Sequence, residues 1–119
     1  MRFLSYISNM PKNLDHSGIK SIVNSYDLFF IDLWGVVHNG INLYENSIKV
    51  LENLAAAKKD FVLLTNAPRL NENVVNFLKK IGLKKYFENV FTSGEAAHKH
   101  LVNELDKQKF FHIGPPRDF

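Results

Sequence analysis

The sequence of 119 residues contains no cysteine, so a disulfide framework and a thiolate-bound metal site are both excluded. No apolar run approaches the ~20 residues that a helix needs to cross a bilayer, and no membrane association is expected. The amino-terminal segment is interrupted by polar residues and by Pro11, unlike a signal peptide. These absences favour a cytoplasmic protein.

The sequence also has no large excess of charge of either sign. The 15 basic and 12 acidic residues are intermixed, with a formal net charge of +3 and no basic stripe or tail, so nucleic acid is not an expected partner. The patterns GxGxxG and GxxxxGK are absent and Asp32 is not part of an acidic cluster, so a dinucleotide binder and a flavodoxin-like receiver are weak alternatives. A chain of this length is expected to form one small domain.

Short apolar runs predict four β-strands, at residues 28–33, 61–65, 90–92 and 110–113. The first run shows no alternation of apolar and polar residues, which is typical of a central strand covered on both faces. The aromatic residues of these runs are therefore expected to lie in the core or at an interface.

Helical spacing of apolar residues predicts helices before and between the strands, at residues 17–25, 46–58, 71–81 and 93–105. Ser17, Asn71 and Ser93 are expected as N-caps, and Gly82 as the residue that ends the third helix. The order α-β-α-β-α-β-α-β predicts a Rossmann-like α/β fold, with a parallel sheet and helices on its faces. The last strand is followed at once by GPPRDF, so this domain is expected to be incomplete.

The segment IDLWGVVHNG places Asp32 where the first strand ends, with Gly35 and Gly40 just beyond it. Ligands of parallel α/β sheets bind at the carboxyl ends of the strands, so this carboxylate is a candidate site residue. Burying it without a partner would cost roughly several kcal/mol, which predicts a cation or a ring of N–H donors beside it. A simple turn aspartate is the alternative.

Three segments together resemble one family: DLWGVVHNG, then LLTNAPR after the second strand, and TSGEAA after the third. They resemble the haloacid dehalogenase superfamily, and within it the class IIA branch of NagD-like phosphatases. Its first motif, DxDGxxxxG, matches Asp32, Gly35 and Gly40, and its second motif matches Thr65 and Asn66. The likeness extends over residues 27–114.

The resemblance implies hydrolysis of a small phosphorylated substrate through an aspartyl phosphate. Asp32 would be the nucleophile, and Mg²⁺ would be held by Asp32 and the backbone carbonyl of Trp34. The Thr65 hydroxyl and the N–H groups of Gly35 and Asn66 would bind the phosphoryl oxygens. Thr65 as an ordinary strand-end threonine is the alternative, because β-branched residues are common there.

The sequence departs from the family pattern in two ways. Trp34 stands where the phosphatases have a second aspartate that protonates the leaving group, and an indole cannot supply that proton. The third and fourth motifs, a lysine and a pair of aspartates, are missing. HIGPPRD resembles the start of the cap domain, so we expect a lead-in with a short helix over 1–25, a partial core over 26–114 and a truncated tail over 115–119.

Other polar residues are weaker candidates. His38 could contact a substrate phosphate or replace the missing acid, and Arg69 could attract an anionic substrate. For both residues the pattern favours the alternative, a solvated loop side chain. His98 and His100 cannot chelate a metal together, because residues two apart on a helix do not share a face.

Two functions remain open from the sequence. The first is the amino-terminal part of a class IIA phosphatase, with little or no turnover alone. The second is a non-catalytic module from a truncated reading frame, which binds phosphate or forms homo-oligomers through an exposed sheet edge.

Overall fold

The structure, a computed structural model, describes residues 14–111, 113 and 114. The predicted tail over 115–119 and the first half of the lead-in lie outside the described residues. In chain order the elements are η1 (Ile19–Ser21), η2 (Val23–Ser25), β1 (Leu28–Asp32), α1 (Glu45–Ala56), β2 (Asp60–Thr65), α2 (Asn71–Lys80), η3 (Phe87–Asn89), β3 (Val90–Thr92) and α3 (Ser93–Glu104). None of the described helices is long and apolar enough to span a membrane.

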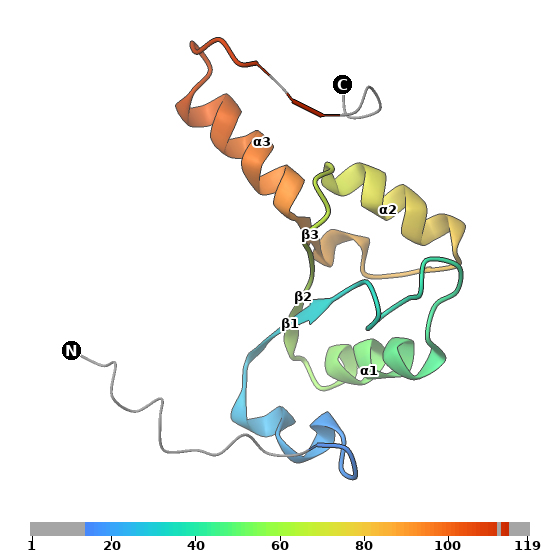
Figure 1. Cartoon of the computed structure of the whole chain (residues 1–119). Helices are drawn as coiled ribbons and strands as arrows, with labels where there is room; N and C mark the ends of the chain where they lie inside the picture. The colour runs from blue at the N-terminus through green and yellow to red at the C-terminus, as the bar shows by residue number, and fades with distance from the viewer. Residues whose placement is uncertain (1–13, 112, 115–119) are drawn as a thin grey trace, which may run out of the picture.

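The strands form a parallel sheet in the order β1-β2-β3, which confirms the predicted α/β fold (Figure 1). Asp32 pairs in register with Leu64, and Thr65 with Thr92, so the carboxyl ends of all three strands are level. Right-handed crossovers that advance in one direction place their helices on one face of a sheet. That face carries the core, which consists of Leu33, Val37, Leu51, Leu54, Phe61, Leu63, Val74, Leu78, Leu83 and Val90.

Few of the described residues cover the opposite face of the sheet. Phe30 is 67% exposed and Leu64 is 41% exposed, and Figure 1 shows α3 leaving the end of β3 and running away from the sheet. The prediction that the first strand is central and covered on both faces is therefore wrong: among the described residues β1 is an edge strand. The apolar composition of β1 indicates that its side chains favour burial. It does not indicate which elements cover them.

The predicted strand over 110–113 is not formed. Residues 110, 111 and 113 have no strand structure, and Phe111 is 91% exposed. Residue 112 lies outside the described residues. An apolar run becomes a strand only beside a hydrogen-bonding neighbour, and α3 carries this one away from β3.

One predicted helix and two predicted helix caps are wrong. The segment 17–25 forms two 3₁₀ turns instead of an α-helix. The N-caps of α2 and α3 are Leu70 and Thr92, and not the predicted Asn71 and Ser93. Gly82 follows α2 with φ of +103°, which confirms its predicted role at the end of that helix.

Candidate functional site

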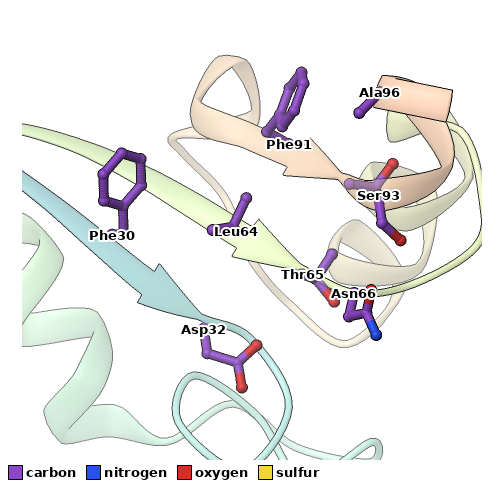
Figure 2. A pocket seen from close by; sticks show the side chains of 9 residues that line it. Phe30, Asp32, Leu64, Thr65, Asn66, Phe91, Ser93 and Ala96 are labelled. Carbon is purple, nitrogen blue, oxygen red and sulfur yellow. The ribbon is translucent and has the colours of Figure 1, made fainter. Parts of the chain in front are cut away.

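The level ends of the three strands bring the predicted site residues to one edge of the sheet. Asp32 is the last residue of β1 and Thr65 the last of β2 (Figure 2). Thr92 is the last residue of β3. An open groove of about 600 Å³ runs along this edge and up the uncovered face. Its lining consists of Phe30, Asp32, Leu64, Thr65, Asn66, Phe91, Thr92, Ser93 and Ala96.

Asp32 itself is exposed at the tip of its strand. Its Oδ1 accepts a hydrogen bond from the N–H of Leu33 at 2.8 Å, which orients the carboxylate. The expectation of a buried carboxylate that needs a cation to offset its desolvation is therefore wrong, because water solvates this side chain. Its predicted place, at the carboxyl end of a parallel strand and beside the Thr65–Asn66 turn, is confirmed.

A tight turn follows Asp32. The Leu33 carbonyl accepts from the N–H groups of Val37 at 2.8 Å and His38 at 3.1 Å, and the Gly35 N–H donates to the His38 carbonyl at 2.8 Å. The Gly35 N–H is thus occupied within the turn, and its predicted donation to a phosphate would require that bond to break. The described structure contains no hydrogen bond to the Trp34 carbonyl oxygen, which leaves this oxygen available as a ligand.

His38 is not a solvated loop residue, since it is buried with 5% exposed. Its Nδ1 accepts from the Gly40 N–H at 2.9 Å, so the ring proton resides on Nε2. The ring packs edge-on against Trp34 and Phe77, at 5.5 and 5.3 Å between centroids. Burial lowers the pKa of His38, and the nearby Asp32 charge partly opposes this.

The lowered pKa of His38 makes stability dependent on pH. As the pH falls through 6.5, the ordinary pKa of histidine, His38 gains a proton in the unfolded chain before it does so in the folded chain. The free energy of unfolding should therefore fall as the pH drops. We expect His38→Gln to show a smaller fall than the wild type between about pH 7.5 and about pH 5.5 in urea denaturation. The exposed His98→Gln is the control and should keep the wild-type slope. An equal slope in all three proteins would contradict this account.

Trp34, at the position of the missing acid, lies over Gly40. A Cβ built on Gly40 would stand 2.6 Å from Cη2 of the indole, and Gly40 has φ of +89°, so the turn requires glycine there. The indole is 67% exposed and borders a second hollow of about 350 Å³. This hollow also brings together the predicted residues His38, Thr65 and Arg69.

Thr65 is half-buried and its Oγ1 accepts from the Ala67 N–H at 3.3 Å. The hydroxyl proton is therefore still available for an acceptor in the groove. Asn66 and Arg69 are exposed. The Thr65 side chain thus keeps a donor in the groove that Asp32 also lines.

Sequence reasoning missed a second set of residues, at the start of α3. Thr92 is fully buried and caps α3, its Oγ1 accepting from the Glu95 N–H at 2.9 Å. The same hydroxyl donates to the Arg69 carbonyl, and Ser93 Oγ donates to the Ala67 carbonyl at 3.1 Å. The pattern TSGE is a capping-box signature that would have identified Thr92 as the cap.

His98 and His100 are exposed on α3 and do not contribute to the groove. The described part of the chain contains no group of three or more histidine, cysteine, aspartate or glutamate side chains that could hold a metal ion. Among the described residues that line the groove, Asp32 is the one acidic side chain, so a cation bound there would rely on it and on backbone oxygen.

Comparisons with known proteins agree with this geometry. A family model described as haloacid dehalogenase-like hydrolase matches residues 29–118. A haloacid dehalogenase-like hydrolase from Brucella suis 1330 is 32% identical over 92% of this chain and 38% of its own, with a TM-score of 0.68. No curated protein matches the sequence significantly.

Two further structures are phosphatases by name. The 4-nitrophenylphosphatase of Thermotoga maritima is 28% identical over 69% of this chain and 32% of its own, with a TM-score of 0.60. The glycerol phosphate phosphatase of Mycobacterium tuberculosis, in complex with magnesium, is 28% identical over 68% and 24%, with a TM-score of 0.53.

The chain thus spans 38% or less of the length of each of these structures. The matched residues of this chain include both motifs on which the resemblance to class IIA rests. The comparisons therefore confirm that resemblance. The chain belongs to the haloacid dehalogenase-like hydrolases.

Proposed function

We propose that this chain carries the nucleophile and the phosphate-binding turn of a phosphatase that acts on a small phosphorylated metabolite in the cytoplasm. The observation that carries the proposal is the meeting of Asp32, Thr65 and Asn66 around one groove, at the carboxyl ends of neighbouring parallel strands. The Asp32 carboxylate attacks phosphorus as the bond to the leaving oxygen breaks. Water then hydrolyses the aspartyl phosphate, which releases inorganic phosphate and restores Asp32.

The chain offers donors for the phosphoryl oxygens. The Thr65 hydroxyl keeps its proton for this purpose, and the backbone of Asn66 follows directly at the same strand end. Gly35 is the weakest of the predicted donors, because its N–H is held by the His38 carbonyl. The substrate phosphate is therefore expected to rest mainly on the Thr65–Asn66 turn.

The oxygen atoms present fit Mg²⁺ in kind. The second carboxylate oxygen of Asp32 and the Trp34 carbonyl oxygen accept no hydrogen bond within the described residues. Mg²⁺ favours such hard oxygen ligands, often uses one or two carboxylates and keeps several waters. When bound, it would neutralise charge on the phosphoryl oxygens. The magnesium complex of the mycobacterial phosphatase supports this assignment.

Turnover by this chain is expected to be weak. General acid catalysis contributes typically about 10²–10⁴-fold, and Trp34 cannot supply it. His38 is buried and its Nδ1 accepts the Gly40 N–H, so it is poorly placed to replace the acid. The proposal is tested by transfer of the phosphoryl group from acetyl phosphate to Asp32 in the presence of Mg²⁺; a chain that forms no adduct would contradict it.

A self-associating module is a second candidate, and one observation favours it. The edge strand β1 presents Phe30, 67% exposed, and Leu28, 45% exposed, on the uncovered face of the sheet. Unpaired strand edges with exposed apolar side chains promote association between copies of a chain. In this alternative the occupant of the face is a second copy of this chain.

The second candidate predicts a mass that rises with protein concentration in light scattering. Phe30→Ser should shift the protein towards monomer, because it removes the largest exposed side chain of β1. Ile41→Ser is the matched control, since Ile41 is 75% exposed but lies outside the sheet. A wild-type protein that stays monomeric at every concentration would exclude this candidate.

A further inference from the structure

The loop between β2 and α2 is bound to the start of α3 by hydrogen bonds that neither the phosphatase chemistry nor the helices themselves require. The Ala67 carbonyl accepts both the Gly94 N–H and the Ser93 hydroxyl, each at 3.1 Å. Ala67 lies only two residues after Thr65, so these bonds hold the loop immediately beyond the phosphate-binding turn.

Thr92 is the centre of this arrangement. Its side chain is fully buried, its hydroxyl donates to the Arg69 carbonyl and accepts from the Glu95 N–H, and its backbone N–H donates to Oδ1 of Asn71 at 2.9 Å. A hydroxyl has a single proton. Because that proton is given to Arg69, Thr92 cannot itself donate to a phosphate, although it lines the groove.

Asn71 and Glu95 close the ring of contacts. Oε2 of Glu95 accepts from the Asn71 N–H at 3.1 Å, while Asn71 accepts from Thr92. Both residues lie in the first turns of helices, so two helix starts and the loop are joined. The described residues contain no buried side-chain polar atom without a hydrogen-bond partner, and this holds for the buried side-chain atoms of the ring.

Gly94 adds a steric constraint to the hydrogen bonds. A Cβ at this position would lie 2.3 Å from the Arg69 nitrogen, so the loop backbone touches the α3 backbone directly. The loop is therefore fixed by contacts at Ala67, Arg69 and Asn71, at every second residue after the strand end. A segment fixed this closely has few alternative conformations available to its first residues.

We propose that Thr92 is a positioning residue for the phosphate site: it holds the loop 66–71 so that the Thr65–Asn66 turn faces Asp32 before any ligand binds. The inference rests on the proposed function in so far as that turn binds phosphate. Hydrogen-bond donors that are held in place before binding need no reorganisation when the anion arrives. If the loop becomes less ordered, the anion binds more weakly even though no contact to it is removed.

The test uses the full chain with inorganic phosphate and Mg²⁺, with affinity measured by calorimetry and by Trp34 fluorescence. Thr92→Val removes the hydroxyl at nearly constant shape, and Thr92→Ser keeps it. We expect phosphate affinity to fall about tenfold in the valine variant and to stay near the wild-type value in the serine variant. Amide hydrogen exchange of residues 66–71 should accelerate in the valine variant alone.

A second pair of variants covers the case in which Thr92→Val does not fold. Asn71→Ala removes the acceptor for the Thr92 N–H, whereas Asn71→Asp retains it. The alanine variant should lose phosphate affinity and loop protection, and the aspartate variant should keep loop protection. Phosphate affinity that is equal across both pairs would overturn the positioning role.

The two proposals fail in different ways. If the wild-type chain does not bind phosphate, the proposed function of this chain is wrong, and loop exchange alone decides whether Thr92 holds the loop. If the wild type binds phosphate and Thr92→Val binds it equally well, the function stands and the positioning role is wrong.

Discussion

Gly94→Ala is expected to destabilise the fold by about 1–3 kcal/mol, although alanine is by about 1 kcal/mol the better residue inside a helix. Gly94 is the second residue of α3, and its added Cβ would lie 2.3 Å from the nitrogen and 2.5 Å from the oxygen of Arg69. Both atoms belong to the backbone of a loop that is hydrogen-bonded in place, so neither can move cheaply. Steric overlap therefore outweighs helix propensity at this position.

Urea denaturation of Gly94→Ala beside Asn103→Ala checks this prediction. Asn103 is exposed near the end of the same helix, where alanine should leave stability unchanged or raise it slightly. A Gly94→Ala protein as stable as the wild type would show that the loop and α3 are not in contact. It would also remove the steric part of the argument for a fixed phosphate-binding turn.

Asp32→Asn is expected to slow covalent capture of the phosphoryl group from acetyl phosphate by about 10³-fold or more, because a carboxamide is not a nucleophile towards phosphorus. The carboxamide oxygen can still accept the Leu33 N–H, so the turn after β1 should keep its structure. The loss would then report chemistry and not unfolding. Capture is measured as the fraction of protein that gains one phosphoryl group in intact mass spectra.

Asp60→Asn is the matched control for Asp32→Asn. Asp60 is an exposed aspartate at the opposite, amino-terminal end of β2, so its replacement changes the net charge equally but lies away from the groove. It should leave phosphoryl capture at the wild-type level. Equal loss in both variants would point to a general effect of charge and not to Asp32 as the nucleophile.

The parts of the fold that sequence predicted well depend on local information. The strand ends at Asp32 and Thr65 and the helix end at Gly82 follow from apolar runs that meet turn-forming residues. The parts that failed depend on distant neighbours. Asn71 has the side chain of an N-cap, but its Oδ1 binds the Thr92 N–H, 21 residues away, which no local pattern encodes.

The candidate site shows the same division. The resemblance to a family located Asp32 and Thr65, and the structure places both in one groove. The exposure of Asp32 and the burial of His38 were not predicted, because each depends on packing between elements. His38 is enclosed by Phe77 of α2, and β1 has no neighbour beyond it among the described residues.

The central claim is that Asp32 accepts a phosphoryl group. The most direct measurement is peptide mass spectrometry of the wild-type chain after incubation with acetyl phosphate and Mg²⁺, with borohydride reduction to mark the acyl phosphate. We predict that the modified residue is Asp32 and that the label disappears when Mg²⁺ is removed. A label on any other residue, or none at all, would contradict the assignment of Asp32 as the nucleophile.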